Sequence, residues 1–320
     1  MSTLQIYMLK ALRKLYARIF DVKPLMRPEC ICDPEISSRL IYDRLISDEP
    51  CMVARFGAFE LKDILVNYLG VKKETHSIWK YIKGKELDWW WNPVAKINND
   101  FIPTKTDEVL QYCKMMENDI PLVDILGSWL PYERYFEEQL VGCKKIDFEL
   151  LNPYFSKTPW TIALKHKRVL VVHPFSISIN AQYQKRDLLF DNKDTLPEFE
   201  LITFKSVYGL GKHNNSPFDK WFDALNYMKA EIDKIDYDIC LIGCGSYGFP
   251  LAAHVKRMGK KSVLMGGSLQ LLFGIRGKRW ESTSYSDQYD YSVLMNEHWV
   301  RPCEEEVPNV AKKIEGGCYL

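Results

Sequence analysis

The feature that most constrains the fold is a regular alternation of short apolar runs and helix-period segments, which begins near residue 167. The runs with strand character are rich in aliphatic residues and span 168–174, 199–204, 237–243 and 261–265. Segments of helical period lie between them at 178–189, at 221–232 and after Gly248. This order predicts parallel strands joined by right-handed crossovers. We expect an α/β fold with a mostly parallel, Rossmann-like sheet and helices on both faces.

The first half of the chain is expected to add one more buried strand to this sheet. The apolar run 51–57 has strand character and is followed by a helix over 60–65. Three expected parts follow from the whole pattern: an amphipathic helix and linker at 1–35, a single α/β catalytic domain at 36–300, and an irregular C-terminal extension at 301–320.

Composition and charge exclude one broad class of function. The chain has 320 residues, of which 47% are hydrophobic, so it can bury a large core. Its 43 Lys plus Arg are balanced by 42 Asp plus Glu, for a net charge of +1. No global field would concentrate a polyanion on such a surface, and we expect no nucleic-acid partner.

The cysteine pattern and the start of the chain predict a cytoplasmic location. The nine cysteines are scattered, and Cys30 and Cys32 are separated by one residue, unlike the usual zinc knuckle. We interpret them as reduced thiols. The start lacks a secretory signal, and no apolar stretch approaches the roughly 18 residues that span a bilayer.

Residues 1–20 form a basic amphipathic pattern, with apolar residues at helical spacing beside four cations. Such a helix could lie on the inner, anionic face of a membrane, where a lipid-linked acceptor would be found. The alternative is a helix packed on the domain or on a partner subunit.

A glycine-rich turn follows the run 237–243. Gly243, Gly245 and Gly248 have the spacing G-x-G-x-x-G and enclose Ser246 and Tyr247. A strand, this turn and a helix place backbone N–H groups where a pyrophosphate could dock. Glycines also serve simply to make a tight turn. The acidic residue that a dinucleotide site wants about twenty positions later is missing, which argues against NAD.

A second loop is expected at the same edge of the sheet. Gly266 and Gly267 end the next strand and are followed by residues suited to a diphosphate: Gln270, Arg276, Lys278 and Arg279. The alternative is a solvated basic turn, although the neighbouring apolar residues indicate that the segment packs inward.

Three residues are candidates for acid–base chemistry. Glu60 follows a strand end with Arg55 and Gly57, Asp124 has a similar setting, and His173 ends another strand. Transfer to a hydroxyl needs a base, and a leaving diphosphate needs cations. Glu60 could instead be a carboxylate that stabilises a helix N-terminus, and a lone histidine is often structural.

The segment Arg55-Phe-Gly-Ala-Phe-Glu60 resembles the Arg-Phe-Gly-Asp-Gly-Glu signature of the bacterial GT-D fold glycosyltransferases. The strand at 238–245 and the helix that begins Phe249-Pro-Leu-Ala-Ala are similar to the C-terminal segment of that family. The resemblance implies a nucleotide-sugar donor, usually UDP-linked, with the signature carboxylates at the diphosphate and at Mn²⁺ or Mg²⁺. Only Glu60 is matched as a metal ligand, because Ala58 stands where the first carboxylate is expected.

These observations predict a glycosyltransferase that moves a sugar from a nucleotide-diphosphate sugar to a saccharide or lipid-linked acceptor. The segment 266–280 also looks like proteins of capsule and O-antigen gene clusters, so surface-polysaccharide biosynthesis is the expected pathway. Two alternatives stay open: an NAD(P)- or nucleotide-dependent enzyme of another class, such as an oxidoreductase, or a non-catalytic accessory protein that binds nucleotide sugars.

Overall fold

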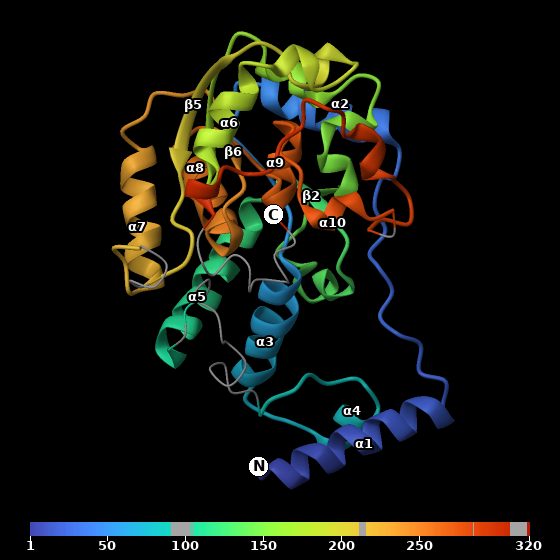
Figure 1. Cartoon of the computed structure of the whole chain (residues 1–320). Helices are drawn as coiled ribbons and strands as arrows, with labels where there is room; N and C mark the ends of the chain where they lie inside the picture. The colour runs from blue at the N-terminus through green and yellow to red at the C-terminus, as the bar shows by residue number, and fades with distance from the viewer. Residues whose placement is uncertain (91–102, 104, 211–215, 284, 308–318) are drawn as a thin grey trace.

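A seven-stranded, all-parallel sheet forms the centre of the protein (Figure 1). The computed structural model describes residues 1–90, 103, 105–210, 216–283, 285–307 and 319–320. The strand order is β3-β2-β1-β7-β6-β4-β5. The strands are β1 (Cys51–Ala54), β2 (Ile125–Ser128), β3 (Lys144–Asp147), β4 (Arg168–His173), β5 (Glu200–Lys205), β6 (Ile239–Ile242) and β7 (Lys261–Leu264). The predicted α/β class is therefore confirmed.

Helices cover both faces of this sheet. The helices of the described residues are α1 (Thr3–Ile19), α2 (Pro34–Ile46), α3 (Val66–Lys72), α4 (Ile78–Ile82), α5 (Thr106–Asp119), α6 (Ser176–Tyr183), α7 (Trp221–Ile232), α8 (Gly248–Arg257), α9 (Leu269–Leu272) and α10 (Lys278–Glu281). Apolar residues of α3, α5, α7 and α8 form the core on one face. Those of α2, α6 and α9 form the core on the other.

The interior strands are apolar because both of their faces are buried. Met52 and Ala54 of β1 enter one core, whereas Cys51 and Val53 enter the other, because successive side chains of a strand point to opposite faces. A central parallel strand is covered by helices on both sides, so it must be apolar at every position.

One predicted helix is shorter than expected. The period over 178–189 suggested a continuous helix, but α6 ends at Tyr183 and a short 3-10 turn, Arg186–Leu188, follows. This change of direction buries Leu189, with 0% of its surface exposed, in the same layer as α6.

Helix α1 lies beside α4, at the end of the molecule opposite α2 (Figure 1). Two of its four basic side chains contact the protein: Lys10 Nζ is 3.6 Å from a carboxylate oxygen of Asp88, and the Arg13 guanidinium lies 4.6 Å from the centre of the Tyr81 ring. Of its residues only Leu9 is buried. Its large exposed apolar residues are Leu4, Tyr7, Met8, Leu12, Leu15 and Ile19. In the described part of the chain, no helix is long and apolar enough to cross a membrane.

Candidate functional site

The site is centred where the carboxyl ends of β1 and β7 lie side by side. Val53 of β1 is paired with Val263 of β7, so the residues after both strands emerge at one edge. The chain then leaves β1 towards one face, where Leu61 packs, and leaves β7 towards the other, where Leu269 packs. In parallel sheets, ligands bind outside the carboxyl ends of strands whose connections diverge in this way.

Arg55 reaches from β1 across the end of β7. A Cβ atom at Gly266 would lie only 2.0 Å from Nη2 of Arg55, and Gly266 has a φ of +68°. Only glycine combines this backbone conformation with so close an approach. Nη1 of Arg55 donates to the carbonyl of Phe56 at 3.3 Å. Among the described residues, no carboxylate forms an ion pair with Arg55, so its charge faces the edge uncompensated.

Arg279 brings a second guanidinium to the same place. Burial raises the pKa of the Tyr285 hydroxyl, and the charges of Arg279 and then Arg55 lower it. Arg279 Nη1 also donates to the Tyr319 hydroxyl at 3.0 Å, and its guanidinium lies 4.7 Å from the centre of that ring.

Gly267 and Gln270 hold the Tyr319 segment against this edge. A Cβ atom at Gly267 would lie 2.1 Å from Cε1 of Tyr319. The buried Gln270 amide donates to the Tyr319 carbonyl at 3.1 Å. Both residues were predicted to bind the donor. In the structure they contact Tyr319 and place its aromatic ring at this edge of the sheet.

The three predicted cations have different contacts. Arg276 donates from Nη2 to the carbonyl of Trp299 at 2.8 Å, and Lys278 is exposed. Arg279 contacts Tyr319, whose ring lies against Gly267, the residue after the Gly266 that Arg55 contacts.

An aromatic pair adjoins Arg55. Trp129, just after β2, stacks on Phe148, just after β3, with ring centres 5.0 Å apart and planes inclined by 26°. Trp129 Nε1 donates to the Phe56 carbonyl at 3.1 Å, and the Arg55 guanidinium lies 5.9 Å from the centre of the Phe148 ring. This arrangement offers an apolar surface beside a cation. Phe148, Tyr285 and Tyr319 were missed by the sequence analysis.

Glu60 lies in the first turn of a π-helix, Phe59–Leu65, that leads into α3. A Cβ atom at Gly57 would lie 2.0 Å from Oε2 of Glu60, so this glycine makes room for the carboxylate. The Tyr112 hydroxyl is buried and has no hydrogen-bond partner among the described residues, and burial, then the charge of Glu60, raises its pKa. Within the described chain Glu60 forms no ion pair.

The residues around Glu60 do not form a metal site of their own. Ala58 supplies no ligand, and in the described residues no group of three His, Cys, Asp or Glu ligand atoms gathers there. Hard cations such as Mg²⁺ bind several oxygen ligands. Here Glu60 supplies one carboxylate, so a bound cation would need its other ligands from substrate phosphates. We derive no step through a metal.

The glycine-rich turn is shaped by packing. A Cβ atom at Gly243 would lie 2.6 Å from the Gly266 carbonyl oxygen, and one at Gly248 would lie 2.5 Å from Leu264 Cδ1. Gly245 has a φ of +60° and is the exposed residue of the turn.

The side chains of this turn point into the core. Ser246 Oγ accepts a hydrogen bond from Trp221 Nε1 at 3.0 Å, and Tyr247 stacks on the Trp221 ring with centres 4.7 Å apart. Ser246 and Tyr247 are 5% and 1% exposed, so what the turn presents to a ligand is the backbone at Gly245.

His173 ends β4 and is buried and neutral. Burial lowers its pKa to about 3. Nδ1 accepts from the Phe175 backbone N–H at 3.0 Å, so the ring proton is on Nε2. The neighbouring N-terminus of α6 is closed to a ligand, because Glu306 accepts from the N–H groups of Ile177 and Ser178.

Asp124 does not have the setting, similar to that of Glu60, that was expected for it. Asp124 precedes β2 and is therefore at the opposite, amino-terminal edge of the sheet. Its carboxylate forms ion pairs with Arg44 and, at 2.6 Å, with Lys256, and accepts from the Met52 N–H at 2.8 Å. It joins α2, β1 and α8.

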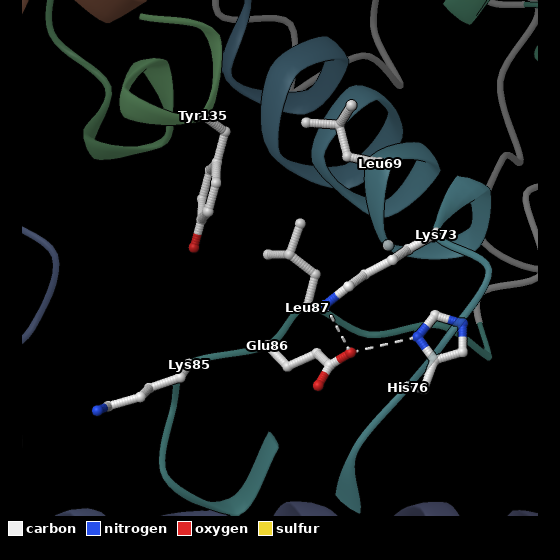
Figure 2. A pocket seen from close by; sticks show the side chains of 8 residues that line it. Leu69, Lys73, His76, Lys85, Glu86, Leu87 and Tyr135 are labelled. Carbon is white, nitrogen blue, oxygen red and sulfur yellow. Dashed lines mark hydrogen bonds and ion pairs between the residues drawn. The ribbon is translucent and has the colours of Figure 1, made fainter. Parts of the chain in front are cut away.

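Two cavities of about 220 Å³ each lie away from the strand edge and share Tyr135 in their walls. Figure 2 shows the first, between the end of α3 and the segment after α4. There Lys73 Nζ and His76 Nδ1 contact the same Glu86 oxygen, at 3.0 and 3.4 Å. Neither cavity is lined by Arg55 or Arg279.

Comparisons with known proteins add no assignment to this geometry: no protein-family model, curated protein or solved structure matches the chain.

Proposed function

We propose that this protein is a glycosyltransferase that takes a nucleotide-diphosphate sugar, UDP-linked in the simplest case, as its donor. The observation that carries the proposal is that the two neighbouring glycines at the end of β7 contact Arg55, at Gly266, and the Tyr319 ring that binds Arg279, at Gly267. Two guanidinium groups at one sheet edge match the charge and the planar, bidentate chemistry of a diphosphate.

The nucleoside is assigned to the aromatic pair of Trp129 and Phe148. Aromatic faces stack on a base, and this pair lies next to the Arg55 guanidinium. The sugar would then lie on the side of the diphosphate that faces Gly57 and Glu60.

The chain's own residues supply the chemistry of transfer. An acceptor hydroxyl oxygen forms a bond to the anomeric carbon, the bond from that carbon to the diphosphate oxygen breaks, and the hydroxyl proton goes to Glu60. Arg55 and Arg279 stabilise the negative charge that the leaving diphosphate gains. Because these cations can neutralise the diphosphate, we expect transfer to continue in a chelator.

The acceptor is proposed to be lipid-linked or membrane-proximal, because α1 presents an apolar stripe to solvent. Leu4, Leu12 and Leu15 are 70%, 44% and 55% exposed, while Lys10 and Arg13 contact the segment after α4. The exposed cations Lys14 and Arg18 lie on the outer part of the same helix. A basic helix with an exposed apolar face binds anionic membrane surfaces.

A thermal-shift panel of nucleoside diphosphates, nucleotide sugars and NAD(P), with manganese or with a chelator, tests the donor class. A ligand that binds only the folded state raises the midpoint by mass action. We expect stabilisation by a nucleoside diphosphate and its sugars in chelator, and its loss in Arg279→Ala. Stabilisation by NAD(P) alone would replace the proposal with an oxidoreductase. Tight donor binding without release of the diphosphate, with acceptor present, would indicate an accessory protein.

A further inference from the structure

The segment between α1 and α2 contacts the outer edge of the sheet at β3 through an isolated bridge. Ile31 forms a parallel bridge with Ile146 of β3, and the Asp147 N–H donates to the Ile31 carbonyl at 2.8 Å. Side chains alternate along extended chains, so the residues next to the bridge project to the face opposite Ile31 and Ile146. Cys30, Cys32 and Asp147 therefore come together, although the single-residue spacing of the cysteines is not that of a zinc knuckle.

The distances within this cluster suit a tetrahedral metal. The two Sγ atoms and a carboxylate oxygen of Asp147 all lie within 4.8 Å of one another. The Sγ atoms are 3.9 Å apart. Two thiolates bound to zinc at about 2.3 Å in tetrahedral geometry are separated by about 3.8 Å. A disulfide would require about 2.05 Å.

The surroundings of the cluster balance its charge and orient its carboxylate. Asp147 is 2% exposed, and Arg27 Nη2 lies 3.2 Å from its Oδ2. The Glu149 N–H donates to Oδ1 at 2.9 Å. Two thiolates and one carboxylate together with Arg27 leave two negative charges, which a divalent ion neutralises. Hydrogen-bonded carboxylate ligands of this kind are typical of metal sites.

We propose that Cys30, Cys32 and Asp147 bind one Zn²⁺ ion, with the fourth coordination position left to water. Thiolate ligands select zinc over the hard cations that a sugar transferase would otherwise use. The ion would attach the linker between α1 and α2 to the end of β3. Phe148, which belongs to the aromatic pair, is the next residue of the chain. This proposal is independent of the proposed transferase activity, since metal binding is measured without any donor.

The test uses the full chain, stripped of metal and kept reduced. Cobalt, which takes the zinc position, reports thiolate coordination by a charge-transfer band, and competition with a chromophoric chelator gives the zinc affinity. We expect one equivalent of metal. Outer partners of a ligand are worth about 10–100-fold in affinity, so loss of a direct ligand in Cys32→Ser should cost more than about 100-fold. Cys303→Ser, which removes a partly exposed thiol outside the cluster, should bind as the unaltered chain does.

Two further readouts separate metal binding from folding. Far-UV circular dichroism should show Cys32→Ser folded, because that thiol is exposed. In the unaltered chain, zinc should protect Cys30 and Cys32 from alkylation, as counted by mass spectrometry. Zinc affinity unchanged in Cys32→Ser, or alkylation of both thiols at saturating zinc, would overturn the proposal.

Discussion

The guanidinium of Arg55 rests directly on Gly266, which links the end of β1 to the end of β7. Gly266→Ala would put a Cβ atom 2.0 Å from Nη2 and displace this guanidinium. We expect at least a tenfold loss of nucleoside-diphosphate affinity by calorimetry. Gly259→Ala is the matched control: its φ of +76° imposes similar backbone strain, about 1–2 kcal/mol, but no atom lies within 4 Å of the added carbon. Equal affinities in the two variants would contradict a role for the Arg55 position.

His173 should make the protein less stable as the pH falls. Its pKa is lowered by burial from 6.5 to about 3, so the stabilisation is complete above pH 6.5 and is lost as the pH falls towards 3. Between pH 7 and pH 5 this group alone should lower the free energy of unfolding by about 2 kcal/mol. Urea denaturation at both values should therefore give a smaller pH dependence for His173→Asn. The contributions of all other titrating groups cancel when the unaltered chain and His173→Asn are compared. Identical pH dependences of their free energies of unfolding would refute the lowered pKa of His173.

Asp124 is expected to act on stability and not on donor binding. Its carboxylate holds Lys256 and the Met52 N–H at the edge of the sheet opposite the site. Asp124→Asn should lower the free energy of unfolding by about 2 kcal/mol, because it leaves partly buried cations without their counter-charge. The nucleoside-diphosphate affinity of the folded variant should equal that of the unaltered chain. A weakened affinity with normal stability would contradict this account.

The strands most readily predicted from sequence were those buried on both faces. The residues Ile239–Ile242 are apolar without interruption, and they form β6, which is an interior strand of the sheet. The edge strand β3, Lys144–Asp147, was missed because it has four residues and only one is apolar. The other edge strand, β5, was predicted because three of its six residues, Leu201, Ile202 and Phe204, are large and apolar.

The candidate site was only partly predictable. Arg55 and Glu60 follow an obvious strand, so their edge of the sheet could be inferred. Asp124 was misplaced because a strand of four residues does not say which of its polar flanks faces the site. Tyr319 joins Arg279 through a contact between residues 40 positions apart, and no local sequence pattern indicates such a contact.

Helix α1 should bind anionic membranes through its exposed stripe. The double change Leu12→Asp and Leu15→Asp places charge on that stripe, and we expect at least a tenfold loss of binding to phosphatidylserine-containing vesicles in co-sedimentation. Val141→Asp alters an apolar residue that is 83% exposed elsewhere and should bind as before. If the double variant binds the vesicles as strongly as Val141→Asp does, α1 does not bind membranes, and its apolar stripe would instead contact another protein.

The central claim is that Arg55 and Arg279 hold a diphosphate, and calorimetric titration with UDP in chelator tests it most directly. Hydrogen bonds between charged groups contribute about 1.5–3 kcal/mol, so Arg55→Gln and Arg279→Gln should each weaken binding by about 10–100-fold. Arg39→Gln, which removes an exposed arginine of α2, should leave the affinity unchanged. UDP binding of equal strength in all three variants would contradict the account.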